Sequence, residues 1–301
     1  MAPNETRCAL GLRLVTAACR RGLIVLVAGA ILIAGARGQA PRGNGVSPAV
    51  VREAGKLALR QPVERELGPG QIDEYIVSVN AGIFLHIAVE KRGVALAVVL
   101  VDPLGRRLVT ADSPNGAFGP QPASLIADRG GEYRIRVEKS ARTAETGRYR
   151  IELTEIHAPT TQDRERIQAE SDLFNAAANE RQQDRVKRQQ AIVAYQRSVA
   201  GWHSLRDDFE EALCLHRIGA LYAALGDKHK GLEYDAQALT LRQAAGDRAG
   251  EADTLNNMGG VYSELGQKQK AFEYYNRVLP RRREVGNEGS AAQALSSGAY
   301  C

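Results

Sequence analysis

The side chains that most often perform catalysis or bind metals are scattered along this chain. It has five histidines, and no two of them have the three- or four-residue spacing that would place two metal ligands on one helix face. They are His86, His157, His203, His216 and His229. The sequence also contains no Gly-x-Ser-x-Gly nucleophile turn, no Gly-x-x-x-x-Gly-Lys-Ser/Thr phosphate loop and no His-Glu-x-x-His zinc motif. We therefore predict no catalytic residue, no metal site and no cofactor.

Single residues that suggest chemistry each have a simpler interpretation. Asp102 precedes a Pro-x-Gly turn, but no acidic neighbours complete a calcium site. His86 alternates with Leu85 and Ile87, which predicts an exposed position on a strand. The basic run 281–283 would suit an acidic partner, although a charged outer helix face explains it equally well.

The first 36 residues have the composition of an export signal. Arg7, Arg13, Arg20 and Arg21 oppose only Glu5, so this segment carries +3 of the formal charge of +5 and leaves +2 for the rest. The remaining balance does not predict a nucleic-acid partner. The 14 apolar residues 23–36 would rise about 21 Å as a helix, less than the roughly 30 Å of a bilayer core. We predict a cleaved signal peptide or a retained membrane anchor over 1–36, and an exported protein.

Cysteine usage does not predict a disulfide framework. Of four cysteines, Cys8 and Cys19 lie in the segment just described. Cys214 and Cys301 remain, too few for a disulfide-stapled domain. Cys214 falls on a helical pattern and is expected to be a small buried residue.

Residues 62–157 show the two-residue period of β-strands. Residues 37–61 precede them with glycines, prolines and polar residues, and we interpret that stretch as a flexible linker. Within 62–157, seven or eight short strands separated by Gly, Pro and Asn breaks predict an all-β sandwich. Residues 94–101 are continuously apolar, which favours a strand buried on both faces.

Several short motifs in this region resemble a bacterial pre-peptidase C-terminal domain. They are Leu67-Gly68-Pro69-Gly70-Gln71, Tyr75, Asp102-Pro103-x-Gly105, Gly131-x-Tyr133-x-Ile135-x-Val137 and Gly147-x-Tyr149-x-Ile151-x-Leu153. That family is a small jelly-roll-like sandwich appended to secreted proteins. The resemblance implies an accessory module over about 90 residues rather than a catalyst. A weaker hypothesis is that the sandwich binds carbohydrate or a cell surface.

From residue 160 to the end the pattern becomes helical and repeats every 40 residues. Shifting 212–251 by 40 positions superimposes Gly219 on Gly259 and Tyr222 on Tyr262, and it aligns two Leu-Gly pairs. We predict repeats at 212–251 and 252–291, a divergent repeat at about 165–208 and an incomplete one at 292–301. Gly226 and Gly246 stand where helices must end in a left-handed residue. Gly219 and Gly259 lie within helices, which predicts close helix approach.

This pattern resembles the tetratricopeptide repeat. Met258-Gly259, Tyr262, Gly266, Ala271, Tyr275 and Val278 match its alternation of small and large residues. Gly231 and Asp235 depart from it in the earlier copy, which predicts weaker packing there. A 40-residue unit resembles the longer-helix version in kinesin light chains and in bacterial proteins with a caspase-like CHAT peptidase. The resemblance thus offers an alternative function, the regulatory front of a secreted CHAT-type peptidase. The sequence ends before the His and Cys dyad that such a peptidase needs, so no activity carries over.

Tetratricopeptide arrays bind peptides in the groove lined by the first helix of each pair. By position, the resemblance places the following residues there: His216, Arg217, Ala220, Ala223, Asn256, Asn257, Ser263 and Glu264. Asn256 and Asn257 are the most suggestive, because an amide can both donate to and accept from an extended peptide backbone. The incomplete repeat leaves an apolar helix face, which predicts self-association.

The sequence therefore predicts a multidomain protein, a jelly-roll-like sandwich followed by an α-helical tetratricopeptide superhelix. We interpret it as a non-enzymatic scaffold that binds a protein or peptide. Its expected location is the periplasm, the medium or the membrane surface of a bacterium, with anchoring through 23–36 as the membrane-bound form.

Overall fold

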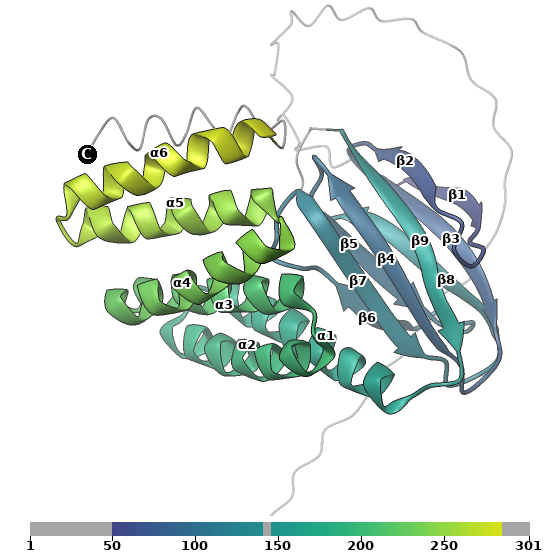
Figure 1. Ribbon diagram of the computed structural model, residues 1–301. Coiled ribbons are helices and arrows are strands. Elements are labelled where there is room, and N and C mark those ends of the chain that lie inside the picture. Colours follow the sequence, from purple (N-terminus) through teal and green to yellow (C-terminus); the bar gives the residue numbers. More distant parts are fainter. Residues whose placement is uncertain (1–49, 141–145, 285–301) are drawn as a thin grey trace, which may run out of the picture. The chain divides into compact units, whose positions relative to one another are not determined.

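The computed structural model of the 301-residue chain describes residues 50–140 and 146–284. Nine strands in this part form two sheets, and six helices follow them (Figure 1). This confirms the predicted fold class, a β-sandwich followed by an α-helical repeat array. The predicted signal or anchor at 1–36 and the incomplete repeat at 292–301 lie outside the described residues. In the described ranges, no helix has both the length and the apolar composition needed to cross a bilayer.

The sandwich consists of a five-stranded and a four-stranded sheet. The first has the order β1-β3-β8-β5-β6, with β1 Val50–Lys56, β3 Gln71–Val79, β8 Gly131–Lys139, β5 Leu96–Val101 and β6 Arg107–Ala111. The second has the order β2-β9-β4-β7, with β2 Val63–Leu67, β9 Gly147–His157, β4 Phe84–Arg92 and β7 Phe118–Ile126. Alternate residues of both sheets form one buried apolar core, as the two-residue period predicts. All six residues of β5 are buried, in agreement with the continuous apolar run.

The linker predicted at 37–61 is wrong in its second part, because residues 50–56 are strand β1. This strand pairs in parallel with β3 at the edge of the sheet. Arg52 of β1 lies 2.7 Å from Asp73 of β3, whose side chain is fully buried, and Tyr149 donates to the same carboxylate. A buried carboxylate requires such partners, so its ion pair with Arg52 helps to hold β1 on the sheet. The alternation of polar and apolar residues in such a short edge strand is too weak to predict this pairing from the sequence.

The six helices form three consecutive antiparallel pairs. They are α1 Thr161–Glu180 with α2 Arg185–Leu205, α3 Asp208–Ala224 with α4 Lys228–Ala245, and α5 Arg248–Glu264 with α6 Lys268–Glu284. The second and third pairs begin about four residues before the predicted repeat boundaries. A repeat length does not by itself show at which residue each repeat begins. Gly226 and Gly246 have φ of +98° and +69°, the predicted left-handed helix ends. Cys214 is fully buried, also as predicted.

Candidate functional site

Close contact between α3 and α4 creates the centre of the site. A Cβ on Gly219 would lie 2.9 Å from the carbonyl oxygen of Gly231 and 3.0 Å from Asp235 Oδ1. Two glycines facing each other therefore let the helix backbones approach more closely than any side chain would allow. The prediction of weaker packing at Gly231 and Asp235 is wrong. These residues stand where the next copy has a small Ala and a large aromatic residue, and they bring the two helices closer together.

Asp235 is fully buried at this contact and joins two repeats. His216 Nδ1 of α3 lies 2.8 Å from its Oδ1, and Asn257 Nδ2 of α5 donates to its Oδ2 at 2.6 Å. His216 is only 7% exposed, because it packs against Asp235. Asp235 thus fixes the orientation of the Asn257 amide from the neighbouring helix pair.

A cavity of about 460 Å³ lies beside this centre. Five of the predicted groove residues line it: His216, Arg217, Ala220, Asn256 and Asn257. Ala223, Ser263 and Glu264 do not, because they lie nearer the far ends of α3 and α5. Glu264 is 65% exposed and pairs with Lys228 at 3.1 Å. Five of the eight predicted groove residues thus line the cavity, and the three nearer the helix ends lie outside it.

Each of the three arginines lining the cavity has a carboxylate partner. The pairs are Arg217 with Glu180, Arg242 with Asp247 at 3.7 Å and Arg282 with Asp253 at 3.3 Å. Arg242 also donates to Thr254 Oγ1 at 2.7 Å and is nearly buried. The middle of the basic run 281–283 therefore faces the cavity rather than forming an outer charged face. In the sequence, Arg242 and Arg282 stand out because arginine recurs at the 40-residue shift. Asp235, beside the cavity, stands out because the next copy has Tyr275 at that position.

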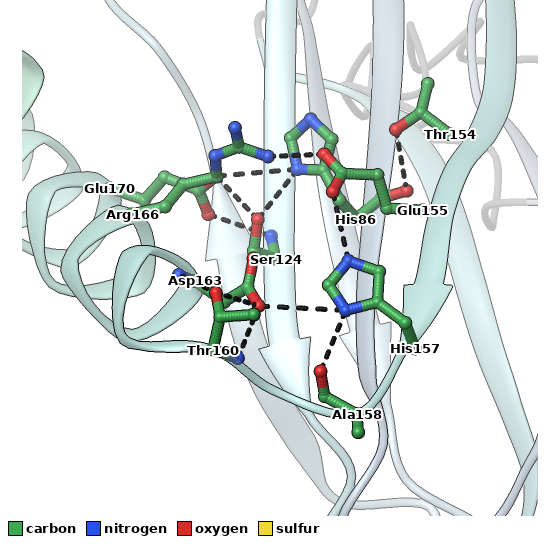
Figure 2. Close-up of polar contacts among 10 residues, drawn as sticks. All are labelled: His86, Ser124, Thr154, Glu155, His157, Ala158, Thr160, Asp163, Arg166 and Glu170. Carbon is green, nitrogen blue, oxygen red and sulfur yellow. Dashed lines mark hydrogen bonds and ion pairs between the residues drawn. The ribbon is translucent and has the colours of Figure 1, made fainter. Parts of the chain in front are cut away.

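A second polar cluster joins the sandwich to α1 (Figure 2). Glu170 of α1 accepts from Ser124 N–H at 2.8 Å and from Ser124 Oγ at 2.7 Å. Ser124 Oγ also lies 2.7 Å from His86 Nδ1, so His86 is covered by α1 and is not the exposed residue predicted from its strand. A two-residue period separates the faces of a strand but cannot tell which polar face another element covers.

Burial shifts the proton equilibria of this cluster in opposite directions. It raises the pKa of Glu170 to about 7. It lowers the pKa of His86 to about 4, and the nearby Arg166 guanidinium contributes to this shift. Both shifts favour the uncharged form of a side chain withdrawn from water.

The Ser124, His86 and Glu170 trio does not have the arrangement of a hydrolase triad. In a triad the carboxylate orients the histidine, whereas here it binds the serine hydroxyl directly. Ser124 is also only 1% exposed. The geometry instead suits a buried joint between the sandwich and the array.

Beside this joint, Glu155, His157 and Asp163 place ligand atoms within 4.8 Å of one another. Those atoms have other partners: Glu155 lies 2.6 Å from Arg166, and Asp163 accepts from Thr160 N–H at 2.7 Å (Figure 2). The Thr160 and Asp163 contacts form a capping box that begins α1. Arg166 thus already supplies a cation to Glu155, and the cluster is explained by helix capping and ion pairing.

The paired helices, their glycine ends and the groove define a helical repeat array. Residues 210–284 match the family model of the tetratricopeptide repeat, which confirms the predicted repeat type. No match was found among curated protein sequences.

Solved structures similar to parts of this chain include representatives of both halves. The tetratricopeptide domain of FLU from Arabidopsis is 20% identical with a TM-score of 0.37, covering 40% of this chain and 98% of that domain. The pre-peptidase C-terminal domain of a collagenase from Bacillus anthracis is 18% identical with a TM-score of 0.28, covering 36% and 98%. Nearly identical TPR-like repeats of a protein assigned as a kinesin light chain of Podosopora anserina are 16% identical with a TM-score of 0.34, covering 47% and 69%.

Proposed function

We propose that this protein is a non-enzymatic scaffold that binds an extended peptide segment of a partner protein in the groove of its repeat array. The observation that carries the proposal is the pair of amides lining the cavity beside the buried Asp235. Tetratricopeptide repeats support a protein-binding role in general. The peptide, its extended form and the groove are the specific parts of the proposal.

The two amides have different roles in this proposal. Asn257 uses one N–H to bind Asp235, so its carbonyl oxygen and second N–H are presented at a fixed orientation. The amide of Asn256 makes no hydrogen bond to any residue of 50–140 or 146–284. An extended backbone offers alternating N–H and C=O groups, and these suit one fixed amide and one adjustable amide.

The charge balance of the cavity favours an uncharged ligand segment. Since its arginines Arg217, Arg242 and Arg282 each have a carboxylate nearby, the wall offers no excess charge to an ionic side chain. Backbone amides of a peptide would pay little desolvation free energy there, because they can exchange hydrogen bonds with water for hydrogen bonds with the wall. A charged side chain would lose its hydration without gaining an ion pair.

Export belongs to this proposal as well. It rests on the arginines and the 14-residue apolar run within 1–36. The partner is then expected outside the cytoplasm of a bacterium. The relation to secreted CHAT-type peptidases has no further support and stays a prediction from sequence.

The groove can be tested with a peptide selected from a phage-displayed library of random linear peptides against the full chain. Asn256→Ala should weaken binding of that peptide about tenfold, the size of one lost hydrogen bond near the upper end of its usual range. Glu264→Ala is the matched control, because Glu264 lies on the same helix away from the cavity. Equal affinities for Asn256→Ala and the unmodified chain in a titration by fluorescence anisotropy would reject the groove.

A further inference from the structure

One wall of the peptide cavity comes from the sandwich rather than from the array. The loop 114–117, between β6 and β7, lines the cavity together with Phe118 and Gly119 at the start of β7. We call residues 114–119 the sandwich loop. The cavity is therefore composite, and a peptide held by Asn256 and Asn257 would have the sandwich loop beside it.

The sandwich holds this loop firmly from its own side. Lys91 of β4, which is only 2% exposed, donates to Asn115 Oδ1, and Asn115 Nδ2 donates to the Pro120 carbonyl at 2.7 Å. The carbonyl of Ala117 accepts from Gly93 N–H at 2.9 Å. A buried lysine bound to the loop amide is costly to displace, so the loop has a defined conformation without a ligand.

The array also contacts this part of the sandwich. Arg181, directly after α1, lies 2.7 Å from Asp112, directly after β6. Gly119 packs against Phe209 of α3: a Cβ at Gly119 would lie 3.1 Å from Phe209 Cζ. Because Gly119 has φ of +88°, a larger residue there would be strained as well as crowded. The Phe209 contact at one end of the loop and the Arg181–Asp112 ion pair just before its other end therefore keep the loop at the cavity.

The composite cavity has two chemically different parts. Ala117 and Phe118 from the sandwich line it with Phe209 and Leu213 of α3, which are all apolar. The amides of α5 supply the hydrogen-bonding part. Phe118 and Phe209 are both partly exposed, so each has ring surface still to cover.

We propose that the sandwich loop is a specificity element of the peptide site: it receives an apolar side chain of the peptide whose backbone is bound by Asn256 and Asn257. This inference rests on the proposed function and adds the chemistry of the ligand. An uncharged, extended segment with an apolar residue fits the paired charges of the wall and the two phenylalanine rings. The sandwich then acts in recognition.

The test places the photo-crosslinking residue p-benzoylphenylalanine at position 117 of the full chain and adds the selected peptide. Crosslinking is expected at 117 and not at 104, because Leu104 is an exposed turn residue of the sandwich away from the cavity. In parallel, Phe118→Ala should weaken peptide binding about tenfold through lost apolar contact. Leu108→Ala, an exposed substitution in the same domain that lies outside the cavity, should leave binding unchanged.

The outcomes separate this inference from the function beneath it. If Asn256→Ala weakens binding but no crosslink forms at 117 and Phe118→Ala binds normally, the loop is not part of the site and only this inference fails. If the library yields no binder, or Asn256→Ala binds as well as the unmodified chain, the groove itself is rejected and this inference with it.

Discussion

Glu170 and Asp235 are both buried carboxylates on helices, but their surroundings differ in one respect. Glu170 binds Ser124 through both oxygens, and the hydroxyl of Ser124 continues to His86. Asp235 binds His216 and Asn257, and Asn257 retains hydrogen-bonding groups at the cavity. A buried carboxylate can thus either close a joint or orient a partner for further binding, depending on whether its neighbours keep free hydrogen-bonding groups.

The largest expected effect is the loss of stability when the buried Asp235 is replaced, compared with replacement of the exposed Asp253 beside the same cavity. Asp235→Ala should lower the free energy of unfolding by about 4 kcal/mol, because it leaves His216 and Asn257 without their buried acceptor. Asp253→Ala should cost at most about 1 kcal/mol, since Asp253 is 52% exposed. Urea unfolding followed by far-UV circular dichroism measures both; equal losses would show that Asp235 has no special role.

The next prediction concerns pH at Glu170. Its pKa rises from 4.5 to about 7 in the folded protein, so the folded state holds this proton more tightly. Its contribution to stability is complete below pH 4.5 and is lost as the pH rises to about 7. The pKa of His86 falls from 6.5 to about 4, so its contribution is lost in the opposite sense, as the pH falls over that range. Between about pH 4.5 and 6.5 the two contributions change with pH by equal and opposite amounts, so their sum stays constant.

Glu170→Gln removes the first contribution and keeps the second. As the pH rises from 4.5 to about 7, the free energy of unfolding of the variant should increase by roughly 3.5 kcal/mol relative to that of the unmodified protein, at about 1.4 kcal/mol per pKa unit. Arg166, Glu155, Asp163 and Asp207 also face this cluster, but they are present in both proteins and cancel in the difference. Unfolding curves of the two proteins at several pH values provide the measurement. A difference that does not change with pH would contradict the buried proton.

The smallest predicted effects compare the uncharged partners of the two carboxylates. Asn257→Ala should lower the free energy of unfolding by about 1 kcal/mol, the loss of one hydrogen bond. Ser124→Ala should lower it by about 2 kcal/mol, because the Ser124 hydroxyl contacts both Glu170 and His86. Only Asn257→Ala should weaken binding of the selected peptide, because Ser124 has no surface at the cavity. Calorimetric titration and thermal unfolding of both variants give the two readouts. Weaker peptide binding by Ser124→Ala would show that the Glu170 cluster also contributes to binding and does not only join the two domains.

Much of the fold could be predicted because it depends on local patterns. Gly226 and Gly246 end helices through their own backbone conformation, and the alternation in β8 and β9 marks the faces that enter the core. Contacts between distant elements were beyond such patterns. The burial of His86 depends on α1, about 80 residues later in the chain.

The candidate site was predictable to the same extent. Helix position predicted that Asn256 and Asn257 lie together on one face of α5, and both line the cavity. Asp235 was interpreted as a defect because it replaces the aromatic residue Tyr275 of the next copy. Its role depends on His216 and Asn257, which two other helices bring to it. The sandwich loop was missed for a related reason, because a repeat pattern contains no information about a neighbouring domain.

The burial of Trp202 has a spectroscopic consequence. It is the only tryptophan of the chain, it is 1% exposed, and it lines a cavity at the joint together with Pro120 and Pro122 of the sandwich. Indole emission moves to longer wavelength when water reaches the ring. The protein therefore contains an intrinsic fluorophore at the boundary of its two domains, and separation of the sandwich from the helices can be followed in solution without a label.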